Sequence, residues 1–190
     1  MQITKYRIQE YIKNLKTFLS DEMIETLIED ASDIYQKLRE DPLLSKSHKL
    51  VQISIKLACD KNMYVVRDKN LKAGNLRLMS MARKITGISQ IIPPTKYVDN
   101  ILEQLAQYNS AEYPHDIYDL LSTTAKKIIK KSIENGYRYS SPMVIAATAI
   151  YVAGIESGYL VTQNALDQCL RVSAVSIRNH YENLMKFYRM

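Results

Sequence analysis

Two residues near the C-terminal end of the chain could contact the base edges of DNA. Arg178 follows Val175 by three residues, which places both side chains on one face of a helix. Arginine can bind the edge of a guanine through two hydrogen bonds, and valine can contact the methyl group of a thymine. A helix that presents both residues in its first turns can enter the major groove.

A second basic set lies upstream of these residues. It consists of Lys126, Lys127, Lys130 and Lys131. On a helix these lysines share one side, and such a side can contact a phosphate backbone. Lysines opposite an apolar stripe are also typical of a solvated helix face, so both interpretations stay open.

Catalytic and metal-binding chemistry finds little support in the sequence. The histidines have no partner at the spacing of metal ligands; they are His48, His115 and His180. Cys59 and Cys169 fall on apolar helical faces, where a small buried hydrophobic residue is the commoner role. No glycine-rich phosphate loop and no Gly-x-Ser-x-Gly motif occurs. We therefore expect that the protein is not an enzyme and holds no metal and no cofactor.

Composition indicates an ordinary folded protein with a modest basic excess. Of 190 residues, 46% are hydrophobic and 24% are charged, which argues against a disordered chain. The 26 Lys and Arg exceed the 20 Asp and Glu, so the net charge is +6, which favours a partner with phosphates. Charged residues interrupt the apolar positions of the first 18 residues, so no secretory signal is expected. The longest uncharged run, residues 139–155, is too short to span a bilayer comfortably, so no membrane partner is expected.

The elements that must position these side chains are helices. Apolar residues recur at three- and four-residue spacing on both sides of Pro93, and no long stretch alternates between apolar and polar residues. The predicted fold class is therefore all-α. The one proline pair, Pro93 and Pro94, follows Gly87 and predicts a boundary between domains 1–92 and 93–190.

The two predicted domains resemble each other. A shift of 94 residues superimposes their apolar patterns and places Ala58 on Val152. The first helices match instead at a shift of 86, which implies eight extra residues near 108–115 in the second copy. We therefore expect two diverged repeats of about five helices each.

The helix over Met143 to Ile155 is predicted to lie at the centre of the second repeat. It contains no charged residue, so other helices must surround it, and alanines such as Ala147 let them approach closely. Ser140, Ser141 and Pro142 supply a cap and a proline in the first turn. The equivalent helix over Lys49 to Cys59 carries lysines and is expected to be less completely enclosed.

The C-terminal stretch predicts a helix-turn-helix. Residues 164–170 form a short helix and 171–173 a turn, and Ser173 caps a second helix over 174–187. Alternatively, the two helices only close the bundle, and the pattern alone does not decide between these readings.

The segment Tyr139 to Ala153, followed by Thr162-Gln163 and by Val175 to Tyr181, resembles the second cyclin repeat of transcription factor IIB and its archaeal counterpart TFB. The likeness covers Pro93 to the C-terminus and is weak in the first repeat. It implies two five-helix cyclin-like repeats that bind the complex of TATA-binding protein with promoter DNA. The helix-turn-helix would then read the sequence beside the TATA box.

The resemblance also implies roles for particular residues. Val175 and Arg178 become candidate base contacts, and Thr162, Gln163 and Ser176 become candidate backbone contacts. The lysine set at 126–131 gains weight as a DNA-facing surface. The implied partners are double-stranded promoter DNA, TATA-binding protein and RNA polymerase. The implied location is the cytoplasm of an archaeon, at the nucleoid, or the nucleus of a eukaryote.

Three departures from the family pattern stand out. Nothing before Tyr11 can house the four ligands of the family's zinc ribbon, so no docking on polymerase through a ribbon is expected. Arg171 stands where the family has glycine in the helix-turn-helix turn, and Leu71 to Gly87 is short for two helices. We expect a factor that modulates initiation without the ribbon. The alternatives are a cyclin-fold module that binds a protein of the transcription machinery without reading DNA, and a kinase-activating cyclin.

Overall fold

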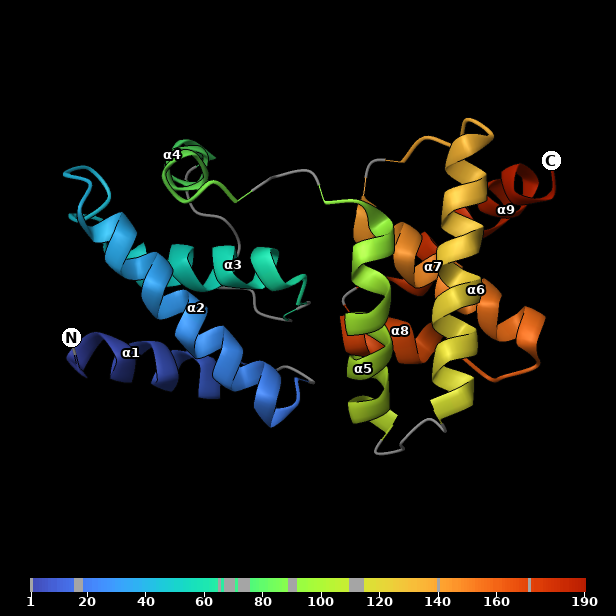
Figure 1. Cartoon of the computed structure of the whole chain (residues 1–190), viewed down its shortest axis with the longest axis horizontal. Helices are drawn as coiled ribbons and strands as arrows, with labels where there is room; N and C mark the ends of the chain where they lie inside the picture. The colour runs from blue at the N-terminus through green and yellow to red at the C-terminus, as the bar shows by residue number, and fades with distance from the viewer. Residues whose placement is uncertain are drawn as a thin grey trace. The chain divides into compact units, whose positions relative to one another are not determined.

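The computed structural model describes residues 2–15, 19–64, 66, 71, 76–88, 92–109, 115–139, 141–170 and 172–190. Across these residues the secondary structure is helical, with nine α-helices and one short 3-10 helix, η1, which confirms the all-α fold class (Figure 1). The chain divides into two units, Met1–Ile91 and Ile92–Met190. No helix in the described residues has both the length and the apolar character to cross a membrane.

Unit 1 contains four helices in its described part. They are α1 (Gln2–Lys13), α2 (Asp21–Arg39), α3 (Leu50–Asn62) and α4 (Leu76–Thr86). Helix α2 contacts the other three, and α3 also contacts α1 and α4. The expectation of about five helices is therefore one helix too high for the described residues of this unit. In the described residues of the short stretch from Leu71 to Gly87, α4 is the one helix.

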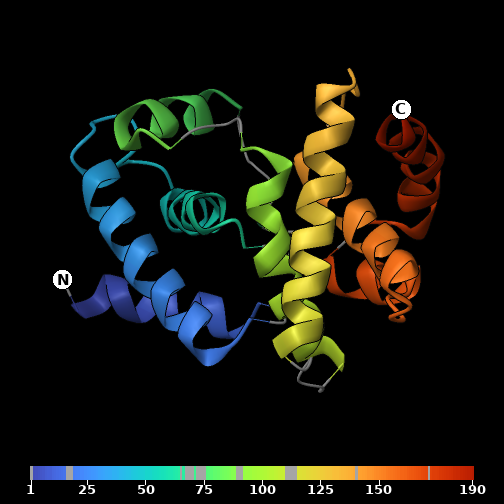
Figure 2. The ribbon, with the colours of Figure 1, turned by 45° about the vertical axis from the view of Figure 1, so that its right-hand side comes forward.

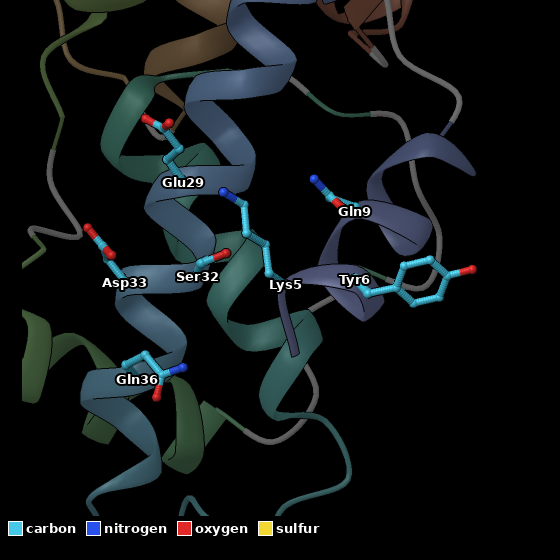
Figure 3. Close-up of a pocket in the computed structure, with 7 residues that line it drawn as sticks. All are labelled: Lys5, Tyr6, Gln9, Glu29, Ser32, Asp33 and Gln36. Carbon is cyan, nitrogen blue, oxygen red and sulfur yellow. The ribbon is translucent and has the colours of Figure 1, made fainter. Parts of the chain in front are cut away.

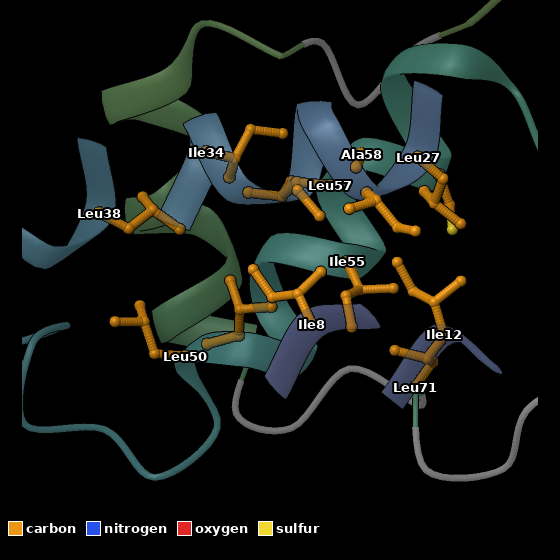
Figure 4. Packing of buried hydrophobic residues seen from close by; sticks show 14 of the residues in the cluster. Ile8, Ile12, Leu27, Ile34, Leu38, Leu50, Ile55, Leu57, Ala58 and Leu71 are labelled. Carbon is orange, nitrogen blue, oxygen red and sulfur yellow. The ribbon is translucent and has the colours of Figure 1, made fainter. Parts of the chain in front are cut away.

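The apolar faces of these helices meet in one core (Figure 4). Its fully buried members include Ile8 and Ile12 of α1, Leu27 and Leu38 of α2, and Ile55 and Leu57 of α3. Helix α2 begins where the sequence predicts, because the Ser20 hydroxyl accepts a hydrogen bond from the Met23 N–H at 3.3 Å.

The described residues of unit 2 form η1 and five α-helices. They are η1 (Pro94–Tyr97), α5 (Val98–Asn109), α6 (His115–Glu134), α7 (Pro142–Ser157), α8 (Gln163–Leu170) and α9 (Ala174–Arg189). Helix α7 contacts η1, α5, α6 and α9, and it lies behind α6 in the views of Figures 1 and 2. The predicted helix over 143–155 is therefore the element around which this unit is packed.

The burial of α7 follows the prediction along its centre and departs from it at its C-terminal end. All residues from Ile145 to Ile150 are buried, but the Ile155 side chain is 53% exposed. Ser141 is the N-cap residue, yet its side chain makes no capping hydrogen bond, and Ser140 lies outside the described residues. The first turn of α7 therefore depends on Pro142 and on packing rather than on a serine cap.

A close backbone contact ends α7 and leads the chain into α8. Gly158 adopts a left-handed conformation, with φ of 69°, and the Tyr159 N–H donates to the Gly154 carbonyl oxygen at 2.8 Å. A Cβ on Gly154 would lie 2.8 Å from the Tyr159 carbonyl oxygen and 3.0 Å from Val161. Glycine at position 154 thus allows the segment before α8 to pack directly against α7.

The predicted shift of 86 residues for the first helices is wrong. Helix α1 begins 96 residues before α5, and the connection 14–20 in unit 1 is longer than the connection 110–114 in unit 2. The second copy therefore contains no eight-residue insertion near 108–115. A shift of 86 would place Tyr11 on Tyr97, but Tyr11 lies in the last turn of α1 and Tyr97 lies in η1, before α5 begins.

Candidate nucleic-acid interface

Helices α8 and α9 form the predicted helix-turn-helix, with only residues 171–173 between them. The Ser173 hydroxyl accepts from the Ser176 N–H at 3.1 Å, and the Asp167 carboxylate accepts from the Ala174 N–H at 3.3 Å. These two bonds satisfy N–H groups in the first turn of α9 and fix the angle at which the chain enters it. Arg171 lies outside the described residues.

The C-terminal half of α9 is tied to α6 and to the turn that follows α6. The Ser132 hydroxyl donates to the Leu184 carbonyl oxygen at 3.3 Å, and the Asn135 amide donates to the Phe187 carbonyl oxygen at 2.6 Å. The ring of Phe187 also packs on Tyr137, with centroids 5.6 Å apart. This half of the helix is therefore part of the bundle.

The middle of α9 is held by two further aromatic contacts. The Tyr137 hydroxyl lies 2.8 Å from Nδ1 of His180, so His180 is not an isolated histidine but part of the packing. Burial raises the pKa of Tyr137, which keeps this hydroxyl protonated. Tyr181 packs edge-on against Tyr151 of α7 at 5.9 Å. Together with buried Ile177, these contacts fix the rotation of α9 about its axis.

The N-terminal turns of α9 face solvent at the predicted positions. The Val175 side chain is 55% exposed, and Arg178 is exposed. Nε of Arg178 lies 3.5 Å from the Ala174 carbonyl oxygen, so the arginine side chain runs back along its own helix toward the N-terminal end. Val175 and Arg178 therefore lie together on one surface, which can meet a partner without any change in the bundle.

Asn179 belongs to the same surface, although sequence reasoning did not select it. It is exposed and lies four residues after Val175 on the same helix face. An asparagine amide can bind adenine through two hydrogen bonds. The signal was present in the sequence, because Asn179 is adjacent to Arg178 and has the spacing of the exposed face.

The three candidate backbone contacts have structural roles as well. The Thr162 hydroxyl accepts from the Ala165 N–H at 3.0 Å and so caps α8. The Ser176 hydroxyl lies 2.9 Å from that of Ser173. Gln163 is the first residue of α8 and is half-buried. All three positions flank the start of a helix in the helix-turn-helix, but two of them already stabilise its fold.

The four lysines of α6 do not form one uniform face. Nζ of Lys126 lies 2.8 and 2.7 Å from the two carboxylate oxygens of Asp99 in α5, and the Ser122 hydroxyl also donates to this carboxylate. Burial raises the pKa of neighbouring Tyr118 to about 12, and the Asp99 charge adds to this shift. The charge of Lys126 is therefore largely compensated inside unit 2.

A second lysine of this set is also occupied. The ammonium group of Lys131 lies 5.3 Å from the centre of the Tyr188 ring, the geometry of a cation–π contact. Lys127 and Lys130 are exposed and form no ion pair with any residue that the structure describes. Lys127 and Lys130 are thus the lysines of this set to which the described residues supply neither an ion pair nor a cation–π contact.

The described residues contain no cluster of three or more His, Cys, Asp or Glu suited to a metal ion. Cys59 and Cys169 are both buried, and burial raises the pKa of each thiol to about 12. Both thiols are therefore protonated at neutral pH. Cys59 and Cys169 fill apolar space, as the sequence predicts.

No protein-family model matches the chain. Curated proteins named transcription initiation factor IIB are similar to it. The protein from Caldivirga maquilingensis is 29% identical over 107 residues, which cover 56% of this chain and 29% of the relative. Factor IIB 2 from Halobacterium salinarum is 27% identical over 169 residues, which cover 83% of this chain and 49% of the relative. Factor IIB 1 from Thermococcus kodakarensis is 23% identical over 120 residues, which cover 63% of this chain and 37% of the relative.

These comparisons confirm the resemblance to transcription factor IIB that the residues themselves indicate. The match with the Halobacterium protein covers 83% of the chain, so it reaches well beyond the C-terminal motifs that carry the resemblance in the sequence. The chain spans less than half the length of each of these relatives.

Proposed function

We propose that the chain acts in transcription initiation as a IIB-like factor that binds promoter DNA together with TATA-binding protein. In this proposal α9 reads the DNA from the major groove. Val175 and Arg178 contact base edges, Asn179 joins them, and Thr162, Gln163 and Ser176 contact the backbone beside them.

One observation carries the proposal: the C-terminal half of α9 is held in the bundle, and its N-terminal turns present Val175 and Arg178 together on one exposed face. Val175 is 55% exposed beside Arg178, while Ile177 between them is buried and fixes the rotation of this face. A valine and an arginine on one rigid face fit a base step that contains thymine and guanine.

We also propose that residues 1–92 and 93–190 are two cyclin-like repeats. Helix α6 begins 94 residues after α2, and a buried hydroxyl occupies the same place in both central helices. The Ser54 hydroxyl donates to the Leu50 carbonyl oxygen at 2.9 Å, and the Thr148 hydroxyl donates to the Val144 carbonyl oxygen at 2.8 Å. Each pair of equivalent residues is separated by the same 94 positions.

The test is a gel-shift titration with DNA that carries a TATA box and varied flanks, with and without TATA-binding protein. Arg178→Ala is expected to cost about 1 to 3 kcal/mol on the preferred flank, because a bidentate contact to guanine is lost. Binding to scrambled flanks should hardly change. Arg189→Ala is the matched control, because it removes the same charge from the exposed C-terminal end of the same helix.

Two outcomes would contradict the proposal. If Arg178→Ala retains its preference for a flank and its melting temperature, Arg178 does not read a base. If the unaltered chain binds no DNA in either condition, the cyclin-fold module that binds only protein becomes the better hypothesis.

A further inference from the structure

Unit 2 contains a groove between the turn at Pro93 and helix α6, which we call the α6 groove. Its volume is about 640 Å³, within the range of sites that hold ligands and peptide side chains. Its floor consists of apolar side chains, namely Pro93, Pro94, Ile129 and Ile133. Pro93 is exposed and Ile133 is 38% exposed, so part of this floor remains open to solvent.

The rim of the α6 groove is basic. Lys126, Lys127 and Lys130 line it, and Glu134 is its acidic member. Because Asp99 holds the ammonium group of Lys126, the uncompensated charge comes from Lys127 and Lys130. These two lysines are three residues apart, so they are neighbours on the surface of α6.

We propose that the α6 groove docks an acidic protein segment that carries apolar side chains. The apolar side chains of the segment pack on Ile133 and Pro93, and its carboxylates pair with Lys127 and Lys130. The positive charge of the rim favours a negatively charged partner. The apolar floor favours a protein segment with apolar side chains. A DNA backbone presents phosphates and sugars but no apolar side chain that would cover Ile133. A DNA partner would therefore leave the apolar floor of the groove exposed.

The corresponding place in unit 1 shows that this combination does not follow from the helix packing alone. A groove of about 720 Å³ lies there between α1 and α2 (Figure 3). It is lined by Lys5, Tyr6, Gln9, Glu29, Ser32, Asp33 and Gln36. In Figure 3 Lys5 extends from α1 toward α2, while Tyr6 points away from α2.

The two grooves occupy the same register on helices that begin 94 residues apart. Where α6 has Lys126, Lys127 and Lys130, α2 has Ser32, Asp33 and Gln36. Where α6 has Ile129 and Ile133, α2 has Tyr35 and Arg39. Among the described residues, the lining of the unit 1 groove therefore contains two carboxylates and one lysine, whereas that of the α6 groove contains three lysines and one carboxylate.

The experiment uses fluorescence polarisation with the full chain and three labelled amphipathic peptides. The first has Glu or Asp at its polar positions and Leu or Phe at its apolar positions. The second replaces every Leu and Phe by Ser, and the third replaces every acidic residue by Lys. We expect only the first peptide to bind, with an affinity that falls as salt rises.

The lysine variant introduces into α6 the residues that α2 carries at the equivalent positions, Asp33 and Gln36. Lys127→Asp with Lys130→Gln is expected to weaken binding of the acidic peptide about tenfold, because one attraction is lost and another becomes a repulsion. Ile133→Ser is expected to weaken it about fivefold, because the apolar contact is lost. Lys186→Ala, an exposed lysine on α9, is the control and should leave binding unchanged.

Failure of this proposal and failure of DNA reading are distinguishable, because the same variants are also titrated with DNA. The docking proposal is overturned if no peptide binds, if the Ser-substituted peptide binds equally well, or if the lysine variant loses DNA affinity instead of peptide affinity. That last result would assign Lys127 and Lys130 to phosphates. Peptide binding by a chain that binds no DNA would support the docking groove and contradict the proposed reading of promoters.

Discussion

The central helices of the two units, α3 and α7, pack against their neighbours through residues of different size and charge. Helix α7 places small residues, Ala147 and Gly154, where neighbouring segments approach it. Helix α3 has Ile53 and Asp60 at the positions 94 residues earlier. One helix is therefore thin and free of charge through its centre, and the other is bulky and carries an ion pair to α4.

Equivalent positions of the two central helices can therefore hold either small residues or a bulky residue and a charged one. In unit 1 the Asp60 carboxylate accepts from Lys56 at 2.7 Å and from Arg83 of α4 at 2.5 Å. In unit 2 the equivalent position must be glycine, because the segment before α8 passes within contact distance. The segment that leads into the helix-turn-helix thus packs on the small residues of α7, whereas in unit 1 an ion pair joins α3 to α4, whose Met79 and Ala82 also pack in the apolar core.

The largest effect is expected from shortening the bulky residue of α3. Ile53 is 3% exposed, so Ile53→Ala should leave a cavity and cost about 2 to 5 kcal/mol of unfolding free energy. Urea denaturation measures the loss, and Leu43→Ala, at a residue that is 61% exposed, is the control. A loss below that of the control would show that this part of unit 1 is not closely packed.

The reverse change in α7 should destabilise by overpacking. Ala147 is fully buried, and Ala147→Leu is expected to cost about 1 to 3 kcal/mol, because helices in close contact leave no room for three more carbon atoms. The melting temperature measures this effect. A variant that melts like the parent would mean that α7 is not the tightly enclosed helix described above.

The ion pair that replaces small residues in unit 1 can be tested separately. Asp60→Asn should cost about 1 to 2 kcal/mol, because Arg83 loses a charged acceptor in a partly buried site. Asp33→Asn, at an exposed position of α2, should stay within about 0.5 kcal/mol of the parent. Equal losses in the two variants would show that the contact between α3 and α4 does not depend on this pair.

Helix type and most helix positions were predictable, because apolar spacing and Ser20 or Ser173 as caps are local signals. The uncharged run in α7 predicted its burial, although the exposed end at Ile155 depends on where neighbouring helices stop. Val175 and Arg178 were predictable as a surface pair from their spacing. The contacts that separate Lys126 and Lys131 from Lys127 and Lys130 were not predictable. They come from Asp99 and Tyr188 on other helices, and the spacing within α6 does not reveal them.

The α6 groove could not be predicted from the sequence, for a similar reason. In the sequence Ile129 and Ile133 belong to one apolar stripe, but the structure buries Ile129 and leaves Ile133 38% exposed beside the proline turn. A local pattern predicts which face of a helix is apolar. It does not predict how much of that face its neighbours cover.

The smallest effect concerns a buried thiol, of which each unit contains one. The folded pKa of Cys59 and of Cys169 is about 12, above the value of an exposed thiol, so the unfolded chain loses these protons first as pH rises. The stability that each buried neutral thiol provides is therefore complete below about pH 8.5 and is lost as pH rises toward 12. Between about pH 8 and about pH 9.5 the unfolding free energy should fall by about 1 kcal/mol per thiol.

The single variants assign this loss to each unit. Cys59→Ala and Cys169→Ala should each remove about half of the decrease between the two pH values, as measured by urea denaturation. The double variant should show almost no decrease there, because the tyrosines ionise only above about pH 10. If one single variant retained the whole decrease, the thiol in that unit would be open to solvent, and its unit would be the more loosely packed of the two. The titration therefore compares how well the thiol of Cys59 is enclosed in α3 of unit 1 with how well that of Cys169 is enclosed in α8 of unit 2.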